Sequence, residues 1–219
     1  MTSTAASTTR LPLSGNAALA AGALIQVVVG LEFLLAGVSK LLDADFAEHF
    51  ATFVAASPGS HVGPLSPILQ GLVLPHAWFA ARLTTFAEIG AGLVLSLSSV
   101  EVARRRFSGR IGAQHAYEPA VALLSAAAAL TAAALSAGIY LVEGGGLPTV
   151  AADNAFGSPI AVEFLLASLG LGIAWLELGR FRALRARRRE GVGQRRAPRV
   201  RRTYRFSFGQ PRRTSLSAS

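Results

Sequence analysis

Four stretches of this sequence are each long and apolar enough to cross a lipid bilayer, and this limits the fold more than any other feature. A hydrocarbon core about 30 Å thick needs roughly 20 helical residues at about 1.5 Å per residue. The first and third stretches also lack the polar face that a surface helix of a soluble protein would carry. We therefore predict an all-α fold, an integral membrane four-helix bundle within residues 17–180. The expected spans are residues 17–39, 77–100, 119–142 and 158–179.

The first stretch has one alternative interpretation, a cleavable signal peptide. Its 23 residues exceed the h-region of about 7–15 residues in such peptides, and no small-residue cleavage motif follows. We therefore expect it to be the first membrane span, preceded by a disordered segment at residues 1–16.

Composition removes several classes of protein and site. Only 15% of the residues are charged, whereas about 25% is usual for soluble domains. The chain has no Cys, which excludes a disulfide framework, a thiolate nucleophile, a zinc ribbon and a Cys-ligated iron–sulfur cluster.

The basic residues predict how the chain is oriented, because short loops rich in Lys and Arg stay on the cytoplasmic side. The loops at 43–76 and 143–157 contain neither Lys nor Arg. Both loops should therefore lie outside, with both termini in the cytoplasm of a multi-pass cell-membrane protein. The basic residues near the expected inner ends are Arg10, Arg104, Arg105, Arg106, Arg110 and those of the C-terminal segment.

The first outer loop carries a short amphipathic pattern. Phe46, Phe50, Phe53 and Val54 form one apolar stripe, which predicts a short interfacial helix on the outer membrane face. Asp45 with Glu48 three residues later is typical of a helix N-terminal capping pair.

The same loop has one alternative ligand set and one further apolar segment. Asp43, Asp45, Glu48 and His49 could instead bind a hard metal ion, but no second ligand cluster accompanies them, so we predict no metal site. Residues 64–75 are apolar yet too short to span, and they fit either a half-helix or a packed loop.

Residues 181–219 form an Arg-rich tail that lacks hydrophobic periodicity after its first turn. We predict that this tail is disordered, with disorder beyond about residue 190. Residues 180–219 hold 14 Arg and one Glu, a charge of +13, which leaves −4 on the other 179 residues of a chain whose total is +9. A cytoplasmic basic tail is attracted to anionic lipids. Binding of nucleic acid is a weaker alternative, because no folded nucleic-acid module accompanies the tail.

Ionisable side chains inside the spans are the most informative residues, since each costs at least about 2.5 kcal/mol to insert. Counted from the outer ends, Lys40 and Arg82 lie shallow, Glu163 lies about 8 Å deep, and Glu32 and Glu88 lie about 15 Å deep. All five can therefore meet in the outer half of one bundle. We expect Lys40 to pair with Glu88 or Glu163, and Arg82 to pair with Glu163 or Glu32.

These five charges fit three interpretations. They hold the helices in register, they form a site for a polar head group, or they reach the lipid interface individually. Two cations against three carboxylates leave one negative charge in excess, and thus one carboxyl able to exchange a proton, as a quinone- or proton-handling site needs.

Two other groups of residues are given structural roles. We expect Glu177 and Arg180 to form a solvated pair at the inner interface. The third span carries small residues that let membrane helices approach closely, and it is expected to be scaffold. These residues are Ser125, Ala129, Ala132 and Ser136.

Two motifs resemble a known family. GLEFLLAGVSKLL at 30–42 contains the pattern Gly30-x-x-Phe33-x-x-x-Gly37-x-x-Lys40-Leu41, and FAEIGAGLVL at 86–95 follows in the second span. This arrangement is similar to the DoxX family of small four-helix membrane proteins, with the related thiosulfate:quinone oxidoreductase subunits and methylamine-utilisation membrane proteins.

The resemblance implies that Lys40 and Glu88 correspond to the family's polar residues and that the chain takes part in membrane redox chemistry. Two departures are the Arg-rich tail and the lack of Cys, so that any electron path must use quinone or a cofactor of a protein partner. The resemblance leaves open whether the chain is an enzyme subunit or an accessory component. We expect the chain to act with a protein partner or as a homo-oligomer. One alternative function is a non-catalytic scaffold that recruits an extracytoplasmic enzyme. Another is a small transporter, which the lack of an inverted repeat disfavours.

Overall fold

The computed structural model describes residues 15–107, 118–145 and 160–196, and over these residues it contains helices and no strands. Four of the helices are long and apolar enough to span a membrane, which confirms the predicted all-α class and the number of spans. They are α1 (Gly15–Leu42), α5 (Ala77–Phe107), α6 (Glu118–Val142) and α7 (Val162–Arg196).

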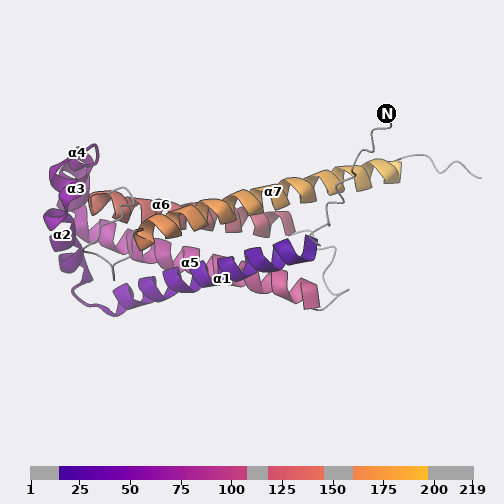
Figure 1. Cartoon of the computed structure of the whole chain (residues 1–219), viewed down its shortest axis with the longest axis horizontal. Coiled ribbons are helices and arrows are strands. Elements are labelled where there is room, and N and C mark those ends of the chain that lie inside the picture. The colour runs from indigo at the N-terminus through magenta and orange to yellow at the C-terminus, as the bar shows by residue number, and fades with distance from the viewer. Residues whose placement is uncertain (1–14, 108–117, 146–159, 197–219) are drawn as a thin grey trace, which may run out of the picture.

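Short helices gather at one end of these four, which we call the capped end (Figure 1). The opposite end, where α1 begins and α7 ends, is called the tail end. The capped end consists of α2 (Phe46–Ala56), α3 (Pro58–His61), α4 (Ser66–Ile68), the π-helical turn η1 (Leu69–Val73) and the 3-10 turn η2 (Leu74–His76). The predicted helix of the first loop is present as α2. Residues 66–76 are helical, although their helix type changes twice before α5 begins.

The capped end is packed and not merely tethered. Val54 of α2, Leu69 of η1 and Val142 at the end of α6 are buried together. A Cβ on Gly59 of α3 would lie 2.6 Å from the carbonyl oxygen of Leu141. The Ser60 carbonyl accepts hydrogen bonds from the Ser66 hydroxyl and the Gln70 amide, both at 2.7 Å. The first loop is therefore a structured layer on the ends of α5 and α6.

The start of α2 differs from the predicted capping pair. Asp45 is the N-cap, but its side chain makes no capping hydrogen bond. A capping side chain reaches the helix from a backbone in the β region, whereas Asp45 has φ −100° and ψ 13°. Asp43 instead stabilises the turn before the helix, because its Oδ1 accepts a hydrogen bond from the Asp45 N–H at 3.1 Å.

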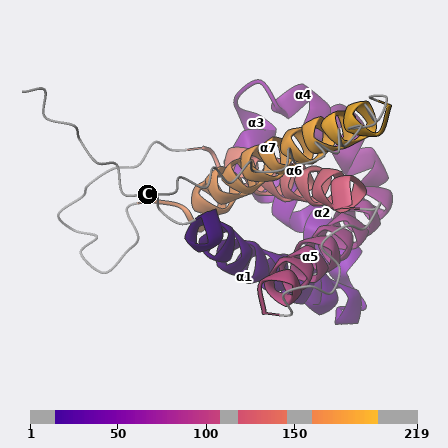
Figure 2. The ribbon, with the colours of Figure 1, turned by 90° about the vertical axis from the view of Figure 1, so that its right-hand side faces the viewer.

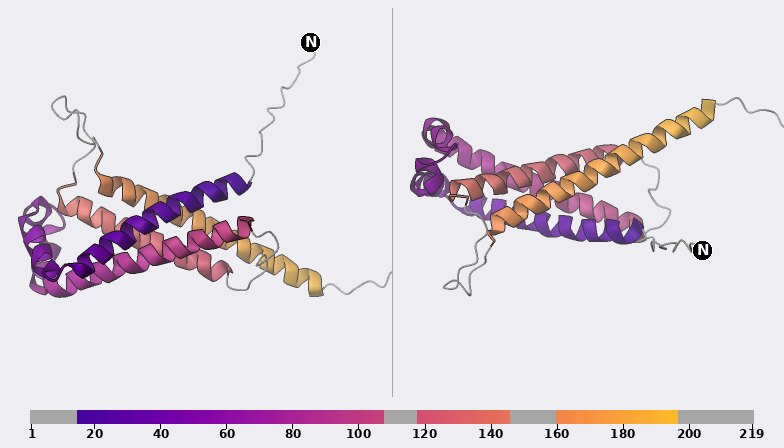
Figure 3. Two further views of the ribbon diagram at one scale, coloured as in Figure 1. Left: turned by 90° about the horizontal axis from the view of Figure 1, so that it is seen from below. Right: turned by 45° about the horizontal axis from the view of Figure 1, so that its top comes forward.

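α1 and α5 lie side by side, and so do α6 and α7 (Figure 3). Glycines bring the backbones of α1 and α5 into contact. A Cβ on Gly92 would lie 2.5 Å from the Leu34 nitrogen, and a Cβ on Gly37 would lie 2.9 Å from the Ile89 nitrogen. Close approach through small residues is how membrane helices gain packing energy without a hydrophobic effect between them.

The small-residue face predicted for the third span is buried in α6. Ser125, Ala129, Ala132 and Ser136 are each at most 3% exposed. A Cβ on Gly170 of α7 would lie 2.8 Å from the Ala129 carbonyl oxygen. This face therefore packs against α7, as a scaffold role requires.

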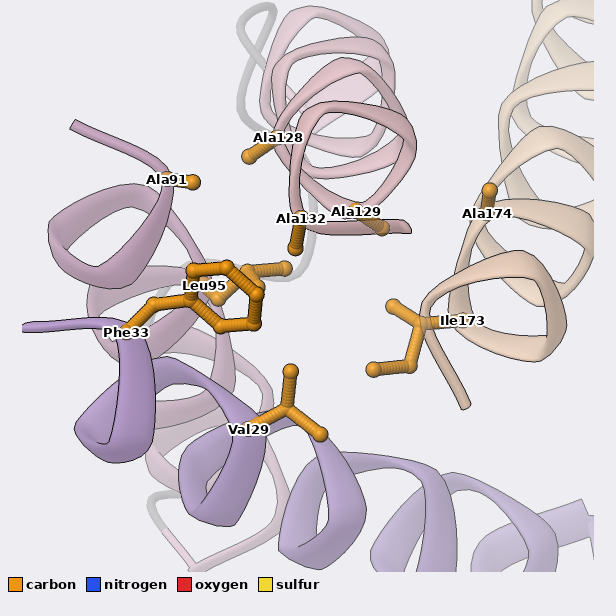
Figure 4. Packing of buried hydrophobic residues seen from close by; sticks show 9 residues of the cluster. All are labelled: Val29, Phe33, Ala91, Leu95, Ala128, Ala129, Ala132, Ile173 and Ala174. Carbon is orange, nitrogen blue, oxygen red and sulfur yellow. The ribbon is translucent and has the colours of Figure 1, made fainter. Parts of the chain in front are cut away.

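The two helix pairs meet around one apolar layer (Figure 4). Figure 2 shows the four helices along the bundle, where α1 and α5 lie below α6 and α7. Most side chains of this layer are small, so the helices approach closely there. Its residues are Val29, Phe33, Ala91, Leu95, Ala128, Ala129, Ala132, Ile173 and Ala174.

α7 is longer than predicted at its C-terminal side. The expected span ends at residue 179, but the helix continues to Arg196 and extends past the other three helices at the tail end (Figure 1). Arg, Ala, Leu and Glu are good helix formers, and extending an existing helix requires no new nucleation. The predicted disorder therefore does not hold for residues 181–196, while residues 1–14 and 197–219 lie outside the described residues.

The outward faces of the long helices are apolar. Several large side chains there are more than half exposed, which suits contact with lipid chains and not with water. Examples are Leu24, Leu35, Leu42, Leu83, Phe86, Leu97, Leu124 and Trp175.

Candidate functional site

Lys40 and Glu88 form an ion pair between α1 and α5 near the capped end. The Lys40 ammonium donates a hydrogen bond to Glu88 Oε1. The Glu88 side chain is 3% exposed and the Lys40 side chain is 25% exposed. The pair therefore extends from the buried face of α5 to the surface of the bundle.

Close packing places this pair. Gly37 lies one turn before Lys40, and a Cβ on Gly37 would come within 3.1 Å of the Glu88 Cβ. The Lys40 ammonium also lies 5.9 Å from the centre of the Phe46 ring at the start of α2. Lys40 thus contacts both α5 and α2, and the face of the Phe46 ring attracts its ammonium group.

Glu88 has an unsatisfied oxygen. Its Oε2 is buried and has no hydrogen-bond partner in the described structure. An unpaired buried carboxylate oxygen is unfavourable, because it loses its hydration without gaining a donor. Such an atom can accept a hydrogen bond from a ligand or, when the carboxyl group is protonated there, donate one.

Arg82 lies apart from this pair. It is half-buried, and its guanidinium lies 5.8 Å from the Trp78 ring centre, one turn earlier on α5. Among the described residues it forms no ion pair with Glu163 or Glu32, so the predicted pairing is not observed. Gly37 lies beside Ile89, so Arg82, about two turns closer to the capped end, lies beyond the last turn of α1 and far from Glu32.

Glu163 meets another carboxyl group and not a cation. α7 begins at Val162, so Glu163 lies in its first turn and is shallower than predicted. It is close enough to Glu143 to influence it: burial raises the pKa of the Glu143 carboxyl, and the charge of Glu163 raises that pKa further. Lys40 pairs with Glu88, one of its two predicted partners, and neither Lys40 nor Arg82 forms an ion pair with Glu163 among the described residues.

Glu32 faces away from the bundle interior. It lies near the middle of α1 and is exposed, whereas Phe33 beside it is buried. The predicted five-residue cluster therefore reduces to Lys40 and Glu88. Glu32 and Glu88 also do not share one level as predicted, because Glu88 lies beside Gly37 and bonds to Lys40, one to two helical turns from Glu32 along α1. Counting depth along a helix determines neither the offset of that helix from its neighbour nor the direction in which a side chain points.

A second polar cluster, near the tail end, was missed as a site. Gln26 of α1 donates a hydrogen bond to the Ser125 hydroxyl of α6 and lies within hydrogen-bonding reach of Glu177. The Arg180 guanidinium is 3.2 Å from Glu177 Oε2. Glu177 is 7% exposed, so the predicted solvated pair is in fact buried among three helices.

One sequence signal could have found Gln26. Counting back from Lys40 in steps of three and four residues gives Gly37, Phe33, Gly30 and Gln26, which form one stripe of α1. Gly37, Phe33, Gly30 and Gln26 are all buried. A polar amide on the same stripe as the two helix-contact glycines should therefore face the interior.

The apolar layer separates the two polar clusters. Along α1, the buried residues Val29 and Phe33 of this layer stand between Gln26 and Lys40.

No group of three or more His, Asp or Glu side chains among the described residues is arranged to hold a metal ion. Asp43 and His49 do form a pair, with 2.9 Å between Oδ2 and Nδ1. The hydrogen bond to His49 lowers the pKa of Asp43, and the same bond raises the pKa of His49. This pair joins the first turn of α2 to the end of α1.

No protein-family model, curated protein or solved structure matches this chain.

Proposed function

We propose that this chain is a DoxX-like protein of the bacterial cell membrane that acts with a redox partner in quinone-linked chemistry. The observation that carries the proposal is the buried Glu88 Oε2 without a hydrogen-bond partner, beside a lysine that reaches the surface. A carboxyl group next to a cation is the combination that a quinone head group requires.

Lys40 and Glu88 would have different roles at a bound quinone. A quinone supplies the two-electron, two-proton couple, and its electrons would come from a cofactor of the partner, because the chain has no Cys. Lys40 would bind a carbonyl oxygen and stabilise negative charge on it. Glu88, when protonated on Oε2, would donate a hydrogen bond to the other quinone carbonyl oxygen and transfer one of the two protons as the quinone is reduced. A thiosulfate:quinone oxidoreductase-like complex is the most concrete form of this proposal.

The proposed placement in the membrane follows from the basic residues. The capped end would lie outside and the tail end in the cytoplasm, where the Arg-rich C-terminal segment binds anionic lipids. The exposed aromatic rings of Trp78 and Phe79 suit the outer interface. In this orientation α2 lies at the outer membrane surface.

A non-catalytic role has its own support. The Lys40–Glu88 pair lies where Gly37 packs against α5, so it can serve to hold α1 against α5. The chain would then be a scaffold whose structured capped end recruits an extracytoplasmic enzyme. A transporter gains no such support, because the apolar layer divides the bundle interior.

Binding of a short-chain quinone to the purified full-length protein in lipid nanodiscs separates the two roles. Glu88→Gln and Lys40→Met should each weaken binding about tenfold or more, since a hydrogen bond to a charged group contributes roughly 1.5–3 kcal/mol. Glu177→Gln is the matched control, because it also removes a buried carboxylate of a span but lies beyond the apolar layer.

Thermal unfolding of each variant completes the experiment. Weaker binding by the Lys40 and Glu88 variants at unchanged melting temperature supports the site. If wild type and all three variants bind the quinone equally or not at all, the quinone site is wrong. A lower melting temperature without any quinone binding supports the scaffold. Thiosulfate-dependent quinone reduction with the partner present then tests the specific reaction.

A further inference from the structure

Glu32 is a carboxyl group on the outer surface of a membrane helix. It lies near the centre of the span Ala21–Leu42 and is exposed, and no described side chain bonds to it. The side chains one turn away on the same surface, Val28 and Leu35, are 59% and 65% exposed. Ionisable groups at such depth almost always face protein or a water-filled cavity. Within one copy of the chain, Glu32 faces neither.

Glu32 belongs to a regular stripe along α1. Steps of four and three residues alternate along it, which is the heptad spacing of a coiled-coil seam. Small residues stand at both ends and a polar residue stands at the centre. All six members are exposed: Ala21, Ile25, Val28, Glu32, Leu35 and Ser39.

A second copy of this chain satisfies Glu32 best. Two copies inserted in the same orientation hold Glu32 at the same depth, so a two-fold axis along the membrane normal brings the two side chains together. A protonated carboxyl has both a donor and an acceptor, so two carboxyl groups that share protons can bond to each other. Polar side chains at one seam position also define the register of paired helices.

We propose that the chain forms a parallel dimer through this α1 stripe, with Glu32 paired to Glu32 of the second copy at its centre. The face that binds α5 is different, because Gly30, Phe33 and Gly37 point to the bundle interior. Each copy can therefore keep its fold and its Lys40–Glu88 pair while it dimerises. The proposal is independent of quinone binding.

The lack of Cys in the chain makes the seam directly testable by cross-linking. Ser39→Cys and Ala21→Cys, made singly in the full-length protein in membranes, should give disulfide-linked dimers on oxidation, since the Cα atoms must approach within about 7 Å. Val38→Cys is the matched control: it lies at the depth of Ser39, but about 100° away around the helix. It should cross-link far less.

A second substitution tests Glu32 itself. Glu32→Leu should lower cross-linking through Ser39→Cys about three- to tenfold, whereas Glu32→Gln keeps a donor and an acceptor and should retain it. Because Glu32 is exposed, neither variant disturbs the interior, which thermal unfolding checks.

Three results would overturn the dimer as proposed. They are equal cross-linking at Val38 and Ser39, no cross-linking at either end of the stripe, or cross-linking unaffected by Glu32→Leu. Cross-links to another protein instead of a second copy would reassign the stripe to a foreign helix.

Discussion

Asp43 joins α1 to α2 through two bonds. One oxygen accepts from the Asp45 N–H, and the other lies against the His49 ring. Neither bond was expected, because the sequence pattern pointed to Asp45 and Glu48 as the capping residues. Which of two nearby aspartates bonds to the backbone at the start of a helix depends on the backbone angles of the turn, and residue spacing does not determine those angles.

The Asp43–His49 pair predicts a pH dependence. The raised pKa of His49 means that its contribution is complete below the ordinary histidine value of about 6.5 and disappears as pH rises through the raised pKa. The lowered pKa of Asp43 means that its contribution is present above about 4 and is lost as pH falls through the lowered value. The turn should therefore be most stable between about pH 4 and 6.5.

Nuclear magnetic resonance titration of the His49 ring measures this interaction. Asp43→Asn should bring the pKa of His49 down towards its ordinary value, because it removes the main bond that raises it. Asp45→Asn is the control and should change the pKa less, since Asp45 acts on His49 only through space. An unchanged His49 pKa in Asp43→Asn would show that the pair does not form.

The Glu177–Arg180 pair predicts that substitutions of Arg180 and of Arg182 change the free energy of unfolding by different amounts. Arg180→Met leaves the buried Glu177 carboxylate without its cation, so the free energy of unfolding should fall by about 1–3 kcal/mol. Arg182 is exposed, and Arg182→Met should change it by less than about 0.5 kcal/mol. Unfolding by denaturing detergent measures both; equal effects would contradict a buried pair.

The sequence predicts where the long helices lie better than it predicts which helices pack against each other. Apolar length identifies the four spans because the bilayer requires it. The end of α7 is missed because a basic sequence does not by itself stop a helix. The pairing of helices is missed as well, because glycines allow close contact without specifying which helix takes it.

Gly92 and Gly90 test the contact between α1 and α5. Gly92→Ala places a Cβ 2.5 Å from the Leu34 nitrogen and 2.7 Å from the Gly30 oxygen. The helices must then separate, and the free energy of unfolding should fall by about 1–3 kcal/mol. A Cβ on Gly90 meets nothing within 4 Å, so Gly90→Ala should be neutral or slightly stabilising.

Chemical or thermal unfolding in one detergent compares the two variants. Gly92→Ala should also weaken the Lys40–Glu88 pair, since that pair depends on the same contact, whereas Gly90→Ala should not. If both variants unfold like the wild type, α1 and α5 do not pack as closely as the structure shows.

Counting the charged residues in the four spans predicted the pairing of Lys40 with Glu88, but it assigned too many other residues to the same site. Depth can be counted along a helix, whereas the rotation of each helix and its offset from its neighbours come from packing. Arg82, Glu32 and Glu163 were therefore assigned to one site with Lys40 and Glu88, whereas helix packing places them apart from that pair. For the same reason Gln26 was missed and Glu177 was assigned to a solvated pair, because the burial of both residues depends on three helices meeting.

The proposed orientation gives the last prediction, which again uses the lack of Cys. Val62 at the capped end is 79% exposed, and Ser217 lies in the Arg-rich C-terminal segment, outside the described residues. Because loops without Lys or Arg are exported and basic segments are retained, an impermeant thiol reagent should label Val62→Cys in intact cells. Ser217→Cys should be labelled only after the membrane is opened. Labelling of Ser217→Cys in intact cells would place the tail end outside, and the Lys40–Glu88 pair would then face the cytoplasm and a different set of partners.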